Sequence, residues 1–398
     1  MQYPVLKGHY MPGNHNPVRS NRNENSANTS LFNGSLRPWV KWPGGKSGEL
    51  SLVIENAPKT QIERFIEPFV GGGSVLLAVD PLIPAAANDI CPELIQLYKA
   101  GAANDAQIKS ELLALANAWE SIGHHREDVL PTAMNFVAKR FAQGSVADNL
   151  FDHFQKDLRN LVPDLINEMK RRFLKDLPKK LDRVDKLQIK NSRLLPLDEM
   201  VDNILGSVYA AFYMAVRWRY NSSRTSNIYS EGRAADFFFL REFSYASMFR
   251  FNAAGEFNVP YGGISYNKKS FTSKVDSLFN PSMKVRLSNT QWHCSDFSAF
   301  LESIEPSQND FIFVDPPYDS DFSDYDNREF AISDQRRLAV ILESLASNVM
   351  VVIGDTPFIR EIYSSSKWVI NEKQKLYSWN IKGRNERNKM HLVITNYS

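Results

Sequence analysis

The chain has 398 residues, of which 43% are hydrophobic, so it can bury a large core and is expected to form one or two domains. Its formal net charge of +2 is unremarkable for a nucleic-acid-binding protein, so the distribution of charge is more informative than the total. Cys91 and Cys294 are the only cysteines, which argues against a disulfide framework and a cysteine-rich zinc site and favours a reducing compartment.

The first 35 residues are polar, include seven asparagines and lack hydrophobic periodicity, so we expect residues 1–35 to form a disordered polar arm. No apolar stretch of the signal-peptide type lies near Met1, and no run of about eighteen apolar residues occurs in the chain. We therefore expect a cytoplasmic protein without a membrane span.

The segment 39–47 contains two glycines followed by Lys46, which superficially matches a phosphate-binding P-loop. A P-loop requires glycine where this chain has Val40, and no strand precedes the segment, so an ATPase is rejected. We expect instead a loop that packs an aromatic residue on a cofactor and reaches the carboxylate of that cofactor with its lysine.

A short apolar strand is predicted from Arg64, and it runs into a glycine triplet that ends at Gly73. Residues 75–79 are expected to begin a helix. Glycines at a strand-to-helix turn let the backbone approach a ligand closely, although they also fit an ordinary turn. Asp89 follows a second apolar run, at a distance that suits an acid bonded to ribose hydroxyls.

Helical spacing of apolar residues predicts a pair of helices packed on the sheet over residues 92–121, with a break at 101–104, and further helices over residues 122–205. Residues 170–193 hold ten Lys and Arg against three acids, whereas residues 301–345 hold three against eleven. The basic segment suits a DNA phosphate backbone, and a solvated helix face is the alternative.

A buried strand is predicted over Phe311–Val314, and it ends at Asp315 because the two prolines that follow can extend neither a helix nor a sheet ladder. Asp315 and the carbonyl of Pro316 can accept both N–H hydrogens of an exocyclic base amine, which frees its lone pair, while Tyr318 stacks on the base. Taken alone, the tetrapeptide also fits an ordinary strand end followed by a turn.

Later strands are predicted at residues 291–295, 349–353 and 391–397, and a capped helix is expected to begin near Ser333.

In combination, the motifs resemble those of the Dam-like (class D12) site-specific DNA adenine-N6 methyltransferases, in the order of that family and from about residue 36 onward. The matching motifs are Lys41-Trp42-Pro43-Gly44-Gly45-Lys46, Phe65-Ile66-Glu67-Pro68-Phe69-Val70-Gly71-Gly72-Gly73, Asn88-Asp89-Ile90, Gly255-Glu256-Phe257-Asn258-Val259-Pro260-Tyr261-Gly262, Asp315-Pro316-Pro317-Tyr318 and, more weakly, Gly354-Asp355-Thr356. The chain departs from the family pattern at Pro43, where alanine is usual, and in two insertions, one of them over about residues 162–205. Neither departure touches the catalytic tetrapeptide.

The resemblance implies S-adenosyl-L-methionine as the cofactor and double-stranded DNA as the substrate. The residues implied to hold the target adenine are Asp315, Pro316, Pro317 and Tyr318. The residues implied to contact the cofactor are Trp42, Lys46, Glu67, Phe69, Gly71, Gly73, Asp89, Ile90, Asp296, Phe297 and Asp315. Asp296 would receive the amine of the cofactor's adenine and Phe297 would stack on it, although Asp296 equally suits the N-cap of a helix. No metal is implied.

Three residues are candidates for DNA binding. Arg250, two residues before Asn252, best matches the base-reading arginine of the family, and Arg224 is a rival because an insertion leaves the register ambiguous. Arginine can bond guanine in a bidentate manner, but phosphate contacts and salt bridges are more common roles.

We therefore predict an α/β protein with a Rossmann-like class I S-adenosylmethionine-dependent methyltransferase sheet and a mostly helical target-recognition insertion. The catalytic domain would comprise residues 36–100 and 261–398, and the DNA-binding insertion residues 101–260. The predicted reaction is direct methyl transfer to N6 of a flipped-out adenine in a short duplex DNA sequence.

Two rival functions remain. An N4-cytosine methyltransferase faces the same chemical problem, but Asp rather than Ser before Pro316 and the order of the motifs favour adenine. A catalytically idle DNA-binding subunit is disfavoured because Lys46, Asp89 and Asp315 are intact. We expect a bacterial or phage-encoded monomer, with a cognate restriction endonuclease as a candidate partner.

Overall fold

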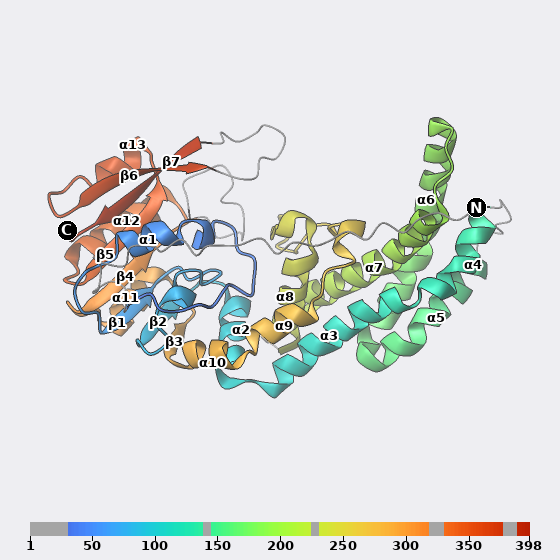
Figure 1. Ribbon diagram of the computed structural model, residues 1–398, viewed down its shortest axis with the longest axis horizontal. Coiled ribbons are helices and arrows are strands. Elements are labelled where there is room, and N and C mark those ends of the chain that lie inside the picture. Colours follow the sequence, from blue (N-terminus) through green and yellow to red (C-terminus); the bar gives the residue numbers. More distant parts are fainter. Residues whose placement is uncertain (1–30, 138–144, 224–230, 318–329, 377–387) are drawn as a thin grey trace, which may run out of the picture.

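A computed structural model describes residues 31–137, 145–223, 231–317, 330–376 and 388–398. Its centre is one mixed sheet of seven strands (Figure 1). In spatial order the strands are β3 (Thr290–His293), β2 (Ala85–Asn88), β1 (Arg64–Glu67), β4 (Asp310–Val314), β5 (Asn348–Gly354), β7 (Asn388–Thr395) and β6 (Val369–Leu376). All neighbours pair in parallel except β7, which is antiparallel to both β5 and β6.

Alternate residues of the central strands belong to two different hydrophobic clusters, as the two-residue period of a strand requires. Ile66 and Ile312 face one cluster, whereas Phe65 and Phe311 face the other. The first cluster is completed by α11 (Phe297–Ile304), α12 (Ile332–Ser344) and α13 (Pro357–Ile362). The second includes residues of α1 (Leu50–Glu55), α2 (Pro92–Ala103), α9 (Thr272–Leu278) and α10 (Pro281–Ser288). The sheet is therefore buried on both faces.

A helical arm extends away from the sheet (Figure 1). Its helices are α3 (Ala106–His124), α4 (Arg126–Val137), α5 (Ser145–Leu161), α6 (Ile166–Asn191), α7 (Leu197–Ser222) and α8 (Glu231–Phe243). The helix break predicted at residues 101–104 is confirmed, because Asn104 adopts a left-handed conformation and the Asp105 side chain caps α3. The expectation that both helices pack on the sheet is wrong for α3, whose partners are α5, α7, α8 and α9.

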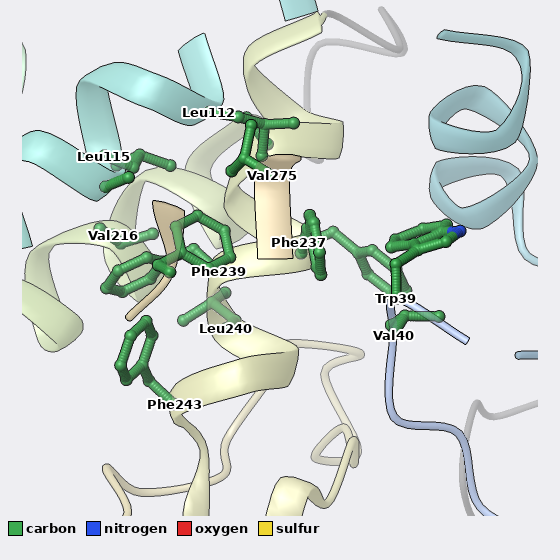
Figure 2. Packing of buried hydrophobic residues seen from close by; sticks show 14 of the residues in the cluster. Trp39, Val40, Leu112, Leu115, Val216, Phe237, Phe239, Leu240, Phe243 and Val275 are labelled. Atoms are coloured by element: carbon green, nitrogen blue, oxygen red, sulfur yellow. The ribbon is translucent and has the colours of Figure 1, made fainter. Parts of the chain in front are cut away.

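Helix α8 joins the arm to the loop that precedes the first strand (Figure 2). Phe238 packs edge-to-face on Trp39 with 4.8 Å between ring centroids. The ring centroids of Phe243 and Trp119, a residue of α3, are 4.0 Å apart. Aromatic residues of one helix thus contact both parts of the molecule, and their burial contributes several kcal/mol in total by the usual ~25 cal/mol per Å².

Two local predictions differ from the structure. Residues 31–35 were expected to belong to the disordered arm, but Leu31 is buried and its carbonyl accepts a hydrogen bond from the Asp80 amide. The helix expected over residues 75–79 is only a single 3-10 turn, Leu76–Ala78, because the chain turns directly toward β2. The strands predicted at 349–353 and 391–397 are confirmed, with slightly different ends.

Among the helices of the described ranges, none combines the length and the apolar character that a membrane span requires.

Candidate active site

A cavity of about 530 Å³ opens where the carboxyl ends of β1, β2 and β4 meet, with the loop after β3 along its side. Parallel strands place their following loops at one edge of a sheet, so segments far apart in the sequence converge there. Every residue implied to contact a cofactor lines this cavity, and so do Pro316 and Pro317. The fourth residue of the tetrapeptide, Tyr318, lies outside the described residues.

The turn after β1 requires glycine at two positions. Gly71 and Gly73 have φ values of +46° and +68°, in the left-handed region that side chains disfavour. A Cβ atom at Gly71 would lie 2.6 Å from the Trp42 ring, and one at Gly73 would lie 2.7 Å from the Tyr98 hydroxyl. The glycines therefore bring the Trp42 loop and the β1 turn together at the cavity wall.

Asp89 is fixed in the cavity by the backbone around it. Its carboxylate accepts hydrogen bonds from the amides of Gly71, at 3.0 Å, and Cys91, at 2.9 Å. Burial raises the pKa of Asp89, and these hydrogen bonds together with the charge of Arg241 oppose that rise. The second strand end thus presents an oriented carboxylate to whatever occupies the cavity.

Asp315 forms an ion pair with a lysine that is 269 positions away in the sequence. The Lys46 side chain is only 2% exposed, and its ammonium donates to Asp315 Oδ1 at 2.6 Å and lies 3.7 Å from Glu49 Oε2. The other carboxylate oxygen of Glu49, Oε1, lies 2.9 Å from Nδ1 of the buried His391. A chain of polar groups therefore runs from β7 to the end of β4, and it orients the carboxylate of the tetrapeptide.

The Asp296 carboxylate caps α11 by accepting from the Ser298 amide, as one of its two predicted roles required. It also lines the cavity and accepts two 2.8 Å hydrogen bonds from Arg337. Burial alone would raise its pKa, but the bonds from Arg337 and Ser298 lower the pKa of Asp296 to about 2. The next residue, Phe297, packs 5.6 Å from Phe69 and forms an apolar wall. Helix capping and a place in the cavity are thus compatible.

The carboxyl group of Glu67 is fully enclosed and accepts a hydrogen bond from the Leu76 amide. Burial, followed by the nearby charges of Asp315 and Asp89, raises the pKa of Glu67 well above 4.5. Since the folded protein holds this proton more tightly than the unfolded chain, the contribution of Glu67 to stability falls as the pH rises above about 4.5.

We predict that Glu67→Gln, which cannot ionise, flattens this part of the pH dependence. Urea unfolding of both proteins, measured from about pH 5 to pH 8, would compare their free energies of unfolding. The wild-type protein should lose more stability than the variant as the pH rises. Parallel curves would show that Glu67 does not stay protonated in the folded protein.

Several residues that line the cavity were not predicted from the sequence, and Arg241, Phe249 and Phe330 have the largest side chains among them. Arg241 of α8 donates to the Lys41 carbonyl at 2.6 Å, and its guanidinium lies 4.5 Å from the Trp42 ring centroid. Phe249 lies just beyond α8, and Phe330 packs 5.5 Å from Phe69. The one sequence signal for Arg241 was its four-residue spacing from Phe237, which puts it on a buried face of α8.

Two of the three predicted DNA-binding residues, Arg250 and Asn252, lie in a hairpin next to this cavity but do not line it. Residues 250–261 form a hairpin, in which Phe251 bridges to Phe257, and Phe249 at its start lines the cavity. The exposed Arg250 donates to Asn258 across the hairpin, and the Asn252 side chain bonds Glu256 within its turn. Arg224 lies outside the described residues.

Comparisons with known proteins agree with this arrangement. The family model for D12 class N6 adenine-specific DNA methyltransferases matches residues 42–378. The chain is 35% identical to the type II methyltransferase M.CviBI of Paramecium bursaria Chlorella virus NC1A over 41% of this chain and 61% of that protein. It is 28% identical to the type II methyltransferase M.MjaIII of Methanocaldococcus jannaschii over 78% of this chain and 80% of that protein. Identity to the DNA N-6-adenine-methyltransferase of Escherichia phage P1 is 31% over 83% of this chain, which is 31% of that protein. With most of its length matched by the family model, the chain belongs to the family of D12 class N6 adenine-specific DNA methyltransferases.

Proposed function

We propose that this protein transfers a methyl group from S-adenosylmethionine to N6 of an adenine that has been flipped out of a specific duplex DNA sequence. The observation that carries the proposal is the position of Asp315. Its carboxylate stands at the end of β4, is paired with Lys46 at 2.6 Å, and lines the same cavity as Asp89. The cavity thus joins a base-amine acceptor to a cofactor-binding edge.

The residues around the cavity fit S-adenosylmethionine. The volume of the cavity lies within the range of about 300–1,000 Å³ that is typical of cofactor sites. The oriented Asp89 carboxylate can accept from ribose hydroxyls, while Phe69 and Phe297 offer an apolar wall for an adenine ring. When bound, the cofactor supplies an electrophilic methyl group on a sulfonium. We assign the cofactor contacts to the eleven residues predicted from the sequence, together with Arg241 and Phe249.

For the target base, the residues of β4 and the turn after it polarise an amine. Asp315 and the Pro316 carbonyl accept its two N–H hydrogens, which localises the nitrogen lone pair for direct attack. The turn is held in place because Gln335, buried in α12, donates to the Pro317 carbonyl at 3.0 Å. Tyr318 is assigned to stacking on the base. Catalysis is then mainly positioning and polarisation.

The strand order supports a Rossmann-like class I methyltransferase sheet. The order reverses between β1 and β4, and ligands of open α/β sheets bind outside the strands at such a reversal. We assign the sheet region, residues 36–100 and 261–398, to catalysis and residues 101–260 to target recognition. In the hairpin, the terminal nitrogens of Arg250 have no partner among the described residues, so they are available for a guanine edge.

Two related functions remain as alternatives, namely N4-cytosine methylation and DNA binding without catalysis. The protein is proposed to act as a monomer in the bacterial or phage-infected cytoplasm, with a restriction endonuclease as a candidate partner. Type II methyltransferases among its relatives favour that partner.

The test is single-molecule sequencing of genomic DNA from a methylation-free bacterial host that expresses the chain, beside an Asp315→Ala control. N6-methyladenine in one short motif, present with the wild-type protein and absent with the control, is the expected result. N4-methylcytosine would establish the nearer alternative. Soluble protein that binds DNA but leaves no mark would favour the idle DNA-binding subunit.

A further inference from the structure

We infer that the outer face of α6 binds the phosphate backbone of duplex DNA that flanks the target site. This inference rests on the proposed function, because it concerns the same DNA substrate. It adds a contact surface outside the cavity and the hairpin.

The cations of α6 form one continuous stripe. They are spaced three or four residues apart, which places them on one side of a helix with 3.6 residues per turn. The stripe consists of Arg172, Lys175, Lys179, Arg183, Lys186 and Lys190. The opposite side is the buried one, with Met169, Phe173, Leu177, Leu181 and Val184. The basic stripe therefore faces solvent, and it extends about 27 Å at ~1.5 Å per residue, or about eight base pairs of DNA.

Half of the stripe is not neutralised by acids. Lys175, Arg183 and Lys190 are exposed and have no ion-pair partner within the described part of the chain. The other three cations pair only with acids of the same helix, as in Lys186 with Asp182 at 2.7 Å. The pairs of Lys179 and Lys186 are exposed, and such pairs are worth only ~0–1 kcal/mol, so phosphates can replace these two acids at little cost.

The positive charge of the stripe also acts on Lys180 near the middle of the helix. Lys180, beside the stripe, has a pKa lowered to about 8 by burial and then by the charge of Arg183. A site that holds more positive charge than its surroundings favours a polyanion such as DNA over a neutral partner.

The stripe begins beside the recognition hairpin. Arg217 donates to the Val259 carbonyl of the hairpin. Burial lowers the pKa of Arg217, and the charge of Arg172 lowers it further, because Arg172 at the start of the stripe lies near Arg217. About two turns of α6 after Arg172, Lys180 and Ile264, which follows the hairpin, both lie 3.0 Å from the position of a Cβ at Gly206. The part of α6 from Arg172 to Lys180 is thus fixed next to the hairpin.

The C-terminal end of α6 projects beyond the rest of the arm (Figure 1). Consistent with that, Leu187 and Ile189 near its end are 50% and 67% exposed. DNA that contacts the hairpin and then follows the stripe is therefore led away from the target base. This geometry assigns α6 to flanking DNA and not to the recognition sequence.

The experiment measures how the affinity for DNA depends on salt. Fluorescence anisotropy would follow binding of random-sequence duplexes of about 40 and about 12 base pairs between ~50 and ~200 mM NaCl. The variant is Lys175→Gln/Arg183→Gln/Lys190→Gln. The matched control is Lys59→Gln/Lys99→Gln/Lys284→Gln, which removes three exposed lysines of the sheet domain. Far-UV circular dichroism would show that both remain folded.

On the longer duplex, the slope of log Kd against log salt should fall in magnitude by about 0.9 per lost contact, or about 2.7 for the α6 variant. The change should be smaller on the shorter duplex, and the control should match the wild-type protein. Replacement of Lys175 and Lys190 by arginine should preserve the slope, because the charge remains.

An unchanged slope in the α6 variant would overturn the inference. The stripe would then be either a solvated surface or a binding site for another protein. Its failure is distinct from failure of the proposed function. If the wild-type protein methylates adenine and the slope is unchanged, only the role of α6 is wrong. If the slope falls but no base is methylated, α6 binds DNA and the proposed reaction is wrong.

Discussion

Replacement of Asp315 by asparagine is expected to reduce kcat for methyl transfer by about 10²–10⁴-fold, the usual contribution of a positioned proton acceptor. Asparagine has nearly the same volume as aspartate, but its amide is a weaker acceptor and can point a donor at the base amine. The lone pair of that amine would then stay delocalised. Kinetics on duplex DNA with tritiated cofactor would measure the loss.

The ion pair with Lys46 makes a control necessary, because a loss of activity could also follow from disorder around that lysine. Glu49, 3.7 Å from the Lys46 ammonium, remains as a carboxylate partner in the variant. Because Asp315 is itself assigned a cofactor contact, we expect cofactor affinity to fall by less than about tenfold, far less than kcat, and the variant to remain folded with at most a modest loss of stability. If Asp315→Asn retained more than about a tenth of the wild-type kcat, the proposed role of this carboxylate would be refuted.

Replacement of Arg233 by methionine is expected to destabilise the protein by about 3–5 kcal/mol, because it leaves a buried carboxylate without its cation. The guanidinium of Arg233 donates to Glu93 at 2.8 Å, and both side chains are almost fully buried. Arg233 also donates to the Tyr220 carbonyl, and the Tyr220 hydroxyl donates to Glu93. Urea unfolding followed by circular dichroism and by tryptophan fluorescence would measure the change.

The double variant Arg233→Met/Glu93→Gln separates the lost charge pair from lost packing. Glutamine still accepts from the Tyr220 hydroxyl and carries no charge, so the double variant should be more stable than Arg233→Met alone. A recovery of about 0.5–3 kcal/mol would match the coupling expected of residues in contact. Equal stabilities of the single and double variants would show that the uncompensated charge of Glu93 does not account for the loss of stability.

Local signals in the sequence were sufficient for most elements of the fold. The break between α2 and α3 was predictable because Gly101, Asn104 and Asp105 act within a few residues of one another. The direction of α3 was not predictable from the sequence, since the apolar face of this helix would suit a sheet or another helix equally well. Only the folded chain shows that α7 and α8 provide the partner surface.

The residues of the site also divide into those that local sequence signals predicted and those that depend on packing between distant segments. Asp89 and Asp315 were predictable because each follows a strand, and parallel strands bring their ends together. The contacts of Lys46 with Glu49, and of Glu49 with His391, depend on how distant segments pack, which no spacing in the sequence reveals. Arg241 was missed for a related reason, since it comes from the helical insertion and reaches the sheet region through α8.

The position of β7 between β5 and β6 has a consequence for the order in which the protein is made. A ribosome synthesises β7 after the other six strands, so β5 keeps one edge without a strand partner until then. His391 on β7 also supplies the contact to Glu49 behind the pair formed by Lys46 and Asp315. A nascent chain that lacks β7 therefore lacks the His391 contact with Glu49 behind the pair of Lys46 and Asp315, and the sheet around this pair is complete only when the final strand enters it.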